Sequence, residues 1–410
     1  MFKHVLTNLL ILVNDSLRNP VYEDIPLKST LPLEVNHRFP CLMLMFLMDS
    51  EISNNMRSER LSFVYHGGSL NYDFGWGHPF RSDRFTRFMS LIEERRLLED
   101  PRVDLVEPEA ATERDLLLVH TEDYLEYVRL RAEANTPLTR DTPLSPSIVG
   151  GALSIVGSSL RAAELVAEGS VGVAEGLGGG LHHAGAGYGG GFCVFNDVAV
   201  CVRALLERYG MDRVLVFDTD VHAGNGTMDV FYEDPRVLFI SVHQDPRTLY
   251  PGTGFIDQMG SGPGEGSTVN VPLPPGADDS CMAMVLEEVF LPLAREFKPE
   301  AIIRNGGSDP HFMDGIGSLG ISLHGLRHIG EVVAGAASEV GCGVVDLCCS
   351  GYNPRTVAQG WLALISGVAG LDEPLVELAP PPVADGGVRG ETRDVISEIQ
   401  LKLAKFWALG

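Results

Sequence analysis

The feature that most constrains the fold of this 410-residue chain is an alternation of short β-branched runs with longer helical stretches, which begins near Leu61. Such alternation is typical of a largely parallel sheet covered by helices on both faces. We therefore expect an α/β protein, a three-layer α/β/α sandwich with a mostly parallel central sheet. The expected strands are residues 61–66, 103–106, 171–175, 214–217, 237–242, 301–304 and 343–347. The expected helices are residues 84–94, 124–134, 148–167, 194–208, 282–296, 324–340 and 394–409.

The chain is expected to have three parts. Residues 1–60 hold scattered apolar patches without a recognisable element, which indicates an N-terminal extension of uncertain order. Residues 61–375 form the α/β domain, and residues 376–410 form a loop and an amphipathic helix packed on that domain. Because ligands of parallel sheets bind beyond the carboxyl ends of the strands, polar clusters at those ends are the first site candidates.

Charge and cysteine content narrow the choice of partners. A formal net charge of −24 argues against nucleic acid, because binding to phosphates depends on Lys and Arg, and it slightly favours a cationic substrate. Seven cysteines without a C-x-x-C pair indicate neither a disulfide framework nor a cysteine-ligated zinc, so we expect a cytoplasmic protein with reduced thiols. No stretch reads as a membrane span, so no membrane partner is expected, and a homo-oligomer is compatible with the sequence.

A candidate metal site follows the expected strand 214–217. Asp218, Asp220 and His222 lie at alternate positions, and alternate residues of a strand point to the same side. Asp220 and His222 are therefore placed to share a divalent ion, with Asp309 after strand 301–304 as a third ligand. Oxygen and nitrogen donors suit zinc, and three protein ligands leave a position open for water. Polar strand ends without a metal are also common, so this pattern alone leaves both readings open.

Two adjacent histidines, His182 and His183, lie on a glycine-rich loop after strand 171–175. Histidine has a pKa near neutrality and suits the general base that activates a water molecule. The alternative is a surface pair without a role. The surrounding glycines do not match the phosphate-binding pattern G-x-x-x-x-G-K-[ST], and the chain has no G-x-S-x-G elbow of a serine hydrolase.

Several short motifs follow one another between residues 65 and 370. They are HPFRSDR (78–84), VHTEDY (119–124), LHHA (181–184), GFCVFND (191–197), DTDVH (218–222), YPGTG (250–254) and SGY (350–352). In content and order they closely resemble the histone deacetylase superfamily, which includes acetylpolyamine amidohydrolases and acetoin-utilisation proteins. The resemblance implies an arginase/deacetylase-like fold and hydrolysis of N-acetylated alkylamines, either an acetylated lysine side chain or a small acetylated amine or polyamine.

The resemblance also implies two cation sites. Asp220, His222 and Asp309 would be the ligands of Zn²⁺, in agreement with the spacing argument. Asp218 and the side chain of Ser241 would help to bind a structural monovalent cation, expected to be K⁺.

Catalytic roles follow from the same resemblance. His182 and His183 would be the paired active-site histidines, with Asp218 orienting His182, and Tyr352 would donate a hydrogen bond to the substrate carbonyl. Asn225 stands where many family members carry a carboxylate partner of the second histidine. The Asn form resembles the class II-like bacterial and archaeal branch, so activity should survive.

A narrow tunnel is the third implied feature. Gly191, Phe192 and Tyr250 resemble residues of the substrate tunnel, in which two aromatic walls hold a linear alkyl chain. Ile316 lies near the mouth and offers no carboxylate that would select polyamines, which mildly favours acetyl-lysine peptides or small acetylated amines. Arg84 resembles an arginine that lines an internal exit path for acetate.

Two other functions compete with deacetylation. An arginase-like ureohydrolase would need a second metal, but Asn225 stands where another Asp is wanted and Asp309-Pro-His lacks a D-x-D pair. A catalytically silent module that binds acetyl-lysine would have no need of Tyr352, which is retained together with the metal ligands and both histidines.

Overall fold

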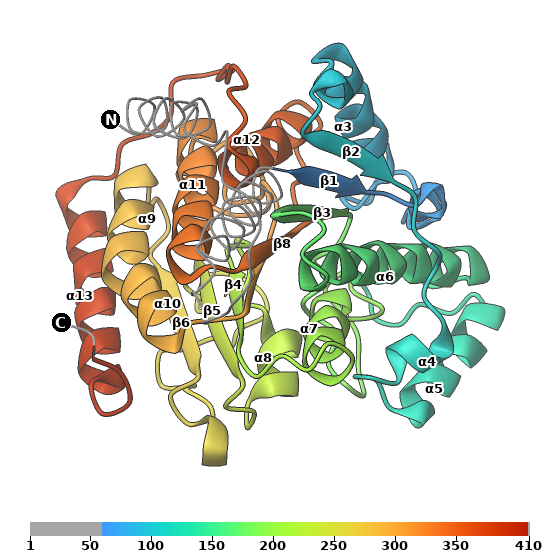
Figure 1. Ribbon diagram of the computed structural model, residues 1–410, viewed down its shortest axis with the longest axis horizontal. Helices are drawn as coiled ribbons and strands as arrows, with labels where there is room; N and C mark the ends of the chain where they lie inside the picture. Colours follow the sequence, from blue (N-terminus) through green and yellow to red (C-terminus); the bar gives the residue numbers. More distant parts are fainter. Residues whose placement is uncertain (1–59, 409–410) are drawn as a thin grey trace, which may run out of the picture. The chain divides into compact units, whose positions relative to one another are not determined.

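The computed structural model describes residues 60–408, in which eight parallel strands form one sheet with helices on both faces (Figure 1). The order across the sheet is β2-β1-β3-β8-β7-β4-β5-β6. The expected three-layer α/β/α sandwich is thus confirmed. Nearly all of the predicted N-terminal extension lies outside the described residues. The strands are β1 (Leu61–Val64), β2 (Val103–Val106), β3 (Val173–Leu177), β4 (Val214–Asp218), β5 (Val237–Gln244), β6 (Thr268–Leu273), β7 (Ala301–Asn305) and β8 (Gly343–Cys348).

The helices between the strands cover the sheet in two layers. On one face lie α6, α7 and α8, and on the other lie α3 and α9 to α13 (Figure 1). Their bounds are α3 (Asp83–Glu94), α4 (Glu113–Leu116), α5 (Glu122–Glu133), α6 (Pro146–Ala167), α7 (Asp197–Glu207), α8 (Asn225–Phe231), α9 (Asp279–Val285), a π-helical turn (Leu286–Phe290), α10 (Leu291–Phe297), α11 (Leu323–Val340), α12 (Val357–Ala369) and α13 (Gly386–Leu403).

Several elements differ from the sequence-based expectation, among them the short helices α4 and α8, which were not expected, and three further differences have a clear physical reason. Strand β6 was not expected because Pro272 interrupts its apolar run, and proline is tolerated in a sheet mainly on an edge strand such as this one. Helix α12 was missed because it is apolar on almost every side, as a fully buried helix is, and so lacks a polar stripe. Helix α13 begins earlier than residue 394, because the Asp385 side chain caps it by accepting hydrogen bonds from the backbone of Gly387 and Val388.

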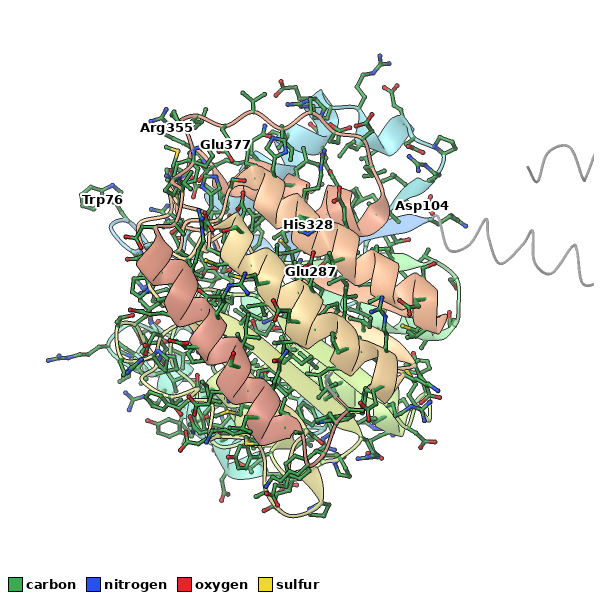
Figure 2. The ribbon with its side chains drawn as sticks, turned by 90° about the vertical axis from the view of Figure 1, so that its left-hand side faces the viewer. Trp76, Asp104, Glu287, His328, Arg355 and Glu377 are labelled. Carbon is green, nitrogen blue, oxygen red and sulfur yellow. The ribbon has the colours of Figure 1, made fainter. Side chains whose placement is uncertain are left out.

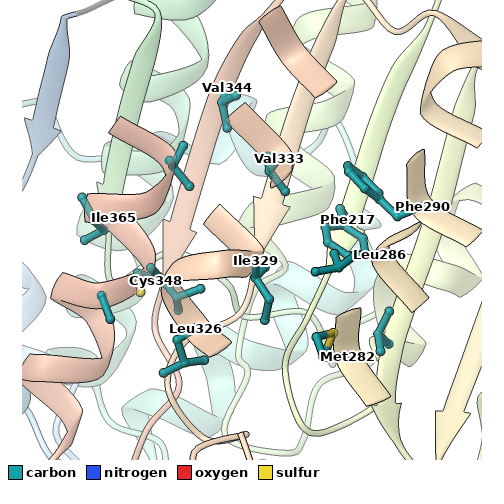
Figure 3. Packing of buried hydrophobic residues seen from close by; sticks show 14 of the residues in the cluster. Phe217, Met282, Leu286, Phe290, Leu326, Ile329, Val333, Val344, Cys348 and Ile365 are labelled. Atoms are coloured by element: carbon teal, nitrogen blue, oxygen red, sulfur yellow. The ribbon is translucent and has the colours of Figure 1, made fainter. Parts of the chain in front are cut away.

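The central strands are buried on both faces. In β4, Leu215 and Phe217 point to one apolar layer, whereas Val214 and Val216 point to the other. Figure 3 shows the first layer, where the rings of Phe217 and Phe290 stack with their centroids 4.2 Å apart. Such two-sided burial explains why β4 reads as an uninterrupted apolar run rather than an alternating one.

Helix α6 is the one helix in the described part that is long and apolar enough to cross a membrane by those two criteria. Such a segment was not expected from the sequence. Since 67% of its apolar window is buried inside the fold, α6 has the character of a core helix.

Three residues with ionisable side chains lie side by side within the apolar layer under α12. Glu175 of β3 is in register with Asp346 of β8, which is in register with Arg304 of β7. The guanidinium of Arg304 pairs with Asp346 and donates to the backbone oxygen of Gly306. All three side chains are buried, and burial together with the charge of Asp346 holds the pKa of Glu175 well above its usual range, which favours the neutral form of this side chain.

A buried histidine makes the stability of the fold depend on pH. The ring nitrogen Nε2 of His120 accepts a hydrogen bond from the backbone N–H of Asn196 at 3.0 Å, which requires a neutral ring, and burial lowers the pKa of His120 to about 4. The unfolded chain binds this proton near pH 6.5. The contribution of neutral His120 to the free energy of unfolding is therefore complete above pH 6.5 and is lost as the pH falls toward 4. At pH 4.5 the free energy of unfolding should be lower by about 2.5 kcal/mol for this reason.

Urea unfolding of the protein and of His120→Gln at pH 7.5 and pH 4.5 would measure this contribution. Between pH 7.5 and pH 4.5, the free energy of unfolding of the original chain should fall by about 2.5 kcal/mol more than that of the variant. Equal losses would show that His120 does not change its protonation between the folded and unfolded states.

Candidate active site

A pocket of about 250 Å³ opens at the carboxyl end of the central strands β3, β8, β7 and β4. Loops that follow these neighbouring strands meet there, as expected for a parallel sheet. The pocket brings together most of the residues selected from the sequence. Its lining includes His182, His183, Gly191, Phe192, Asp220, His222, Tyr250, Ile316 and Tyr352, together with Phe80 and Asp141.

Asp220, His222 and Asp309 form a buried cluster in which one ligand atom of each residue lies within 4.8 Å of the others. Nδ1 of His222 lies 2.9 Å from Oδ1 of Asp220 and 3.3 Å from Oδ2 of Asp309. Oδ2 of Asp309 is buried and accepts no hydrogen bond within the described part of the chain. An unpartnered buried oxygen is costly, and a cation between these donors would satisfy it. The cluster can therefore hold a metal ion.

The orientation of Asp309 is fixed through its other oxygen. Oδ1 of Asp309 accepts a hydrogen bond from the Ser350 hydroxyl at 2.8 Å and one from the backbone N–H of Val221 at 3.2 Å. Oδ2 consequently remains directed at the cluster. Ser350 was seen in the sequence only as part of a motif, and its role depends on β8 lying next to β7.

The electrostatics of the cluster favour a positive charge at its centre. Burial opposes a charged His222, but its hydrogen bond to Asp220 and the nearby carboxylate of Asp309 raise the pKa of His222 to about 10. Although burial favours the protonated form of Asp220, the neighbouring His182 and His222 lower its pKa. Burial and the charge of Asp220 raise the pKa of Asp309 to about 7.

The two histidines differ in their partners. Nδ1 of His182 lies 2.7 Å from Oδ2 of Asp218, and the charges of Asp218 and Asp220 outweigh burial and raise the pKa of His182 to about 9. Nδ1 of His183 lies 2.7 Å from the amide oxygen of Asn225, so this nitrogen donates and Nε2 keeps its lone pair. Burial and the nearby positive histidines lower the pKa of His183. The Nε2 atoms of the two rings are 3.2 Å apart.

Asp218 and Ser241 lie in register on β4 and β5, beneath His182. Oδ1 of Asp218 accepts the backbone N–H of Asp220, and the hydroxyl of Ser241 lies 2.9 Å from Nδ1 of His243. The structure thus places the two residues side by side, as the predicted monovalent cation site requires.

Tyr352 forms one wall of the pocket, against Phe80 and Phe192, with ring centroids 6.3 and 5.8 Å away. Its backbone N–H donates to Oδ2 of Asp314 at 2.6 Å, which also accepts the backbone N–H of Asn353. Asp314 therefore holds the loop that carries Tyr352. The local sequence gives no signal for Asp314, because its partners are backbone groups from a distant segment.

The upper walls of the pocket are aromatic. The ring of Tyr250 lies with its centroid 4.9 Å from that of His183, and Phe192 adopts a positive φ of 69°, which is uncommon for a bulky residue. Glycine is required at position 191, where φ is 55°, directly before Phe192. A Cβ at this position would come within 2.6 Å of the His183 ring. Ile316 lines the same pocket.

Arg84 lies behind the pocket and is 2% exposed. Its guanidinium packs 4.0 Å from the Phe80 ring centroid, and Nη1 donates to the backbone oxygens of Cys349 and Gly351. Nη2 of Arg84 is buried without a hydrogen-bond partner in the described residues. Arg84 thus supports the loop before Tyr352 and keeps one donor free.

The loop that carries the histidine pair has its own anchor. The buried carboxylate of Asp197, at the start of α7, accepts the backbone N–H groups of Gly180 and Leu181 and the hydroxyl of Ser159. In the sequence Asp197 is visible only as the end of a motif, since nothing in the local sequence shows that α7 begins beside this loop.

Comparisons with known proteins agree on the part of the chain that contains this pocket. The family model of the histone deacetylase domain matches residues 78–368. A probable deacetylase of Archaeoglobus fulgidus is 36% identical over 315 residues, which cover 75% of this chain and 86% of that protein. The acetoin utilization protein AcuC of Bacillus subtilis is 33% identical over 329 residues, or 76% and 82% of the two chains. The crystal structure of the HDA15 HD domain matches with a TM-score of 0.75 at 25% identity, over 85% of this chain and 96% of that domain.

Proposed function

Because this chain belongs to the histone deacetylase family and is a hydrolase of the deacetylase class, we propose that it uses zinc to cleave an N-acetylated alkylamine into free amine and acetate. The substrate would be an acetylated lysine side chain or a small acetylated amine or polyamine. The observation that carries the proposal is the buried cluster of Asp220, His222 and Asp309 beside the paired histidines and Tyr352.

The donor set suits zinc in type and spacing. Nitrogen and carboxylate donors at about 2.0–2.1 Å from a tetrahedral zinc lie about 3.4 Å apart, close to the 3.3 Å between His222 Nδ1 and Asp309 Oδ2. When bound, zinc supplies Lewis acidity that polarises a carbonyl group and makes a water molecule a better nucleophile.

The residues of the chain would perform the proton transfers. His183 would take a proton at Nε2 from the attacking water, because Asn225 holds its other nitrogen as a donor. His182, fixed by Asp218, would hold a positive charge next to the reacting atoms. The hydroxyl of Tyr352 would donate to the oxyanion, and His183 would return its proton to the leaving nitrogen.

Two further roles belong to the same proposal. Asp218 and Ser241 would bind a monovalent cation, expected to be K⁺, which would fix the carboxylate that orients His182. Arg84, with its free Nη2, would guide acetate away behind Tyr352. Phe192 and Tyr250 would hold the alkyl chain between them, with Ile316 near the mouth.

The competing functions find less support at the site. A binuclear ureohydrolase would need carboxylates for a second metal, but the described residues contain one group of the metal-binding kind, and Asn225 is engaged with His183. A silent binding module would make no use of a half-buried tyrosine that is held in the pocket wall by Asp314.

We further expect a cytoplasmic protein, since the six cysteines of the described part are free thiols. The division into an extension, a deacetylase domain at residues 61–375 and a C-terminal segment stays a prediction. Helix α13 packs on the domain through Ile396, Ile399 and Leu403.

Metal analysis coupled to an assay of acetate release tests the proposed function. We expect one zinc per chain, loss of acetate release after chelation and recovery when zinc is restored. Asp309→Asn should lose zinc and activity, whereas Glu265→Gln, which changes an exposed carboxylate, should keep both. Two metal ions without acetate release would favour the ureohydrolase, and bound zinc without hydrolysis of either substrate would favour the silent module.

A further inference from the structure

Trp76 is the most exposed large apolar side chain of the described part, with 97% of its surface open to solvent. Figure 2 shows it projecting from its loop beyond the neighbouring side chains. Gly75 and Gly77 flank it with φ angles of 88° and 89°, which a residue with a Cβ adopts only at a cost. Glycine at both positions therefore permits the backbone turn from which the indole projects.

The base of this loop is fixed. The carboxylate of Asp73 accepts hydrogen bonds from the backbone of Gly75 and Ser82 and from the Ser82 hydroxyl. On the other side, Nε2 of His78 lies 3.1 Å from the backbone oxygen of Asp141. Trp76 is consequently presented from a supported loop, and little conformational entropy would be lost when it binds a partner.

The loop lies beside Phe192, which lines the pocket. The rings of Phe74 and His78, which precede and follow Trp76 by two residues, pack against Phe192 with centroids 6.4 and 4.8 Å away. Two residues of chain span no more than about 7 Å, so the Trp76 backbone lies within that distance of the backbone of His78. A substrate whose acetylated side chain entered between Phe192 and Tyr250 would leave its remaining part near the indole.

The chemistry of this position favours a basic group. The face of an exposed indole attracts cations, and the protein is acidic, with a formal net charge of −24. Asp141, whose backbone oxygen supports the loop, also lines the pocket. A small acetylated amine that fits wholly inside the tunnel would leave Trp76 without a contact.

We propose that Trp76 binds the substrate outside the tunnel, and that the substrate is a polypeptide with a basic residue within about three positions of the acetylated lysine, since extended chain covers about 3.3 Å per residue. This proposal rests on the proposed deacetylase function and names its substrate class.

The test compares three substrates: an acetyl-lysine peptide with a flanking arginine, the same peptide with glutamine in its place, and capped acetyl-lysine without flanking residues. Trp76→Ala should lower kcat/KM for the arginine peptide by up to about fivefold and leave it nearly unchanged for capped acetyl-lysine, because a cation–π contact at an exposed site contributes roughly this much. Trp76→Phe should lower kcat/KM for the arginine peptide less than Trp76→Ala does. The control Leu401→Ala, which removes an exposed apolar side chain elsewhere, on α13, should leave kcat/KM unchanged for all three substrates.

Binding to the chelated protein gives a second readout that needs no turnover. Of the three tryptophans, Trp361 is buried and Trp407 is partly buried, so a change in the emission of exposed indole reports on Trp76. The arginine peptide should shift this emission toward shorter wavelength, and Trp76→Phe should abolish the shift.

Equal kcat/KM losses on all three substrates, no loss on any of them, or a change of oligomeric state on ultracentrifugation of Trp76→Ala would overturn the role of Trp76. Absence of acetate release from every substrate by the unaltered, zinc-loaded protein would instead overturn the proposed function. In that case the emission shift would still decide whether Trp76 binds basic peptides.

Discussion

Replacing Tyr352 by phenylalanine should lower kcat for acetate release by about two to three orders of magnitude, the usual effect of removing one donor to an oxyanion. The ring itself is held by Phe80 and Phe192, and the backbone of Tyr352 is held by Asp314. Phenylalanine preserves these contacts and removes only the hydroxyl, so KM and metal content should change little.

Tyr188→Phe is the matched control, because the Tyr188 hydroxyl is hydrogen-bonded to Asn225 and Asp229 and Tyr188 does not line the pocket. Its kcat should fall less than about threefold, as expected for a group that does not touch developing charge. If Tyr352→Phe released acetate as fast as the unaltered protein, Tyr352 would not be the oxyanion donor.

The second large effect is on stability. Asp346→Asn should destabilise the fold by about 3–5 kcal/mol, because it leaves the buried guanidinium of Arg304 without a counter-charge. Glu175→Gln should cost about 1 kcal/mol or less, since burial and the charge of Asp346 already favour the neutral form of Glu175.

Urea unfolding at neutral pH, followed by circular dichroism, would compare the two variants. Each variant replaces one carboxyl oxygen by an NH2 group, at neighbouring positions of the same buried cluster. The two substitutions therefore change the packing to a similar, small extent. Equal destabilisation by both would contradict the assignment of the negative charge to Asp346.

The sequence predicted the parts of this protein that depend on local pattern. The buried strands β4, β7 and β8 read as apolar runs, and the polar residues directly after them, such as Asp220 and Asp309, met in one pocket because parallel strands bring their carboxyl ends to one edge. Adjacent histidines after β3 fell in the same place for the same reason.

Other features were beyond the reach of local pattern. Asp314, Ser350 and Asp197 act through backbone groups and side chains that are distant in the sequence, and only the order of the strands brings these partners together. The edge strand β6 contains a proline, and α12 has no polar face, so the usual periodic signals were absent from both. The catalytic roles of the site residues stay predictions until the variants are assayed.

The position of β8 has a consequence for how the chain is synthesised. It is the last strand to leave the ribosome, yet it lies between β3 and β7 and joins the half-sheet β2-β1-β3 to the half-sheet β7-β4-β5-β6. Until Gly343–Cys348 emerges, both halves present an unpaired apolar edge, and such edges promote association with other chains. A chain that stops before β8 should therefore aggregate rather than persist as a shortened, inactive enzyme.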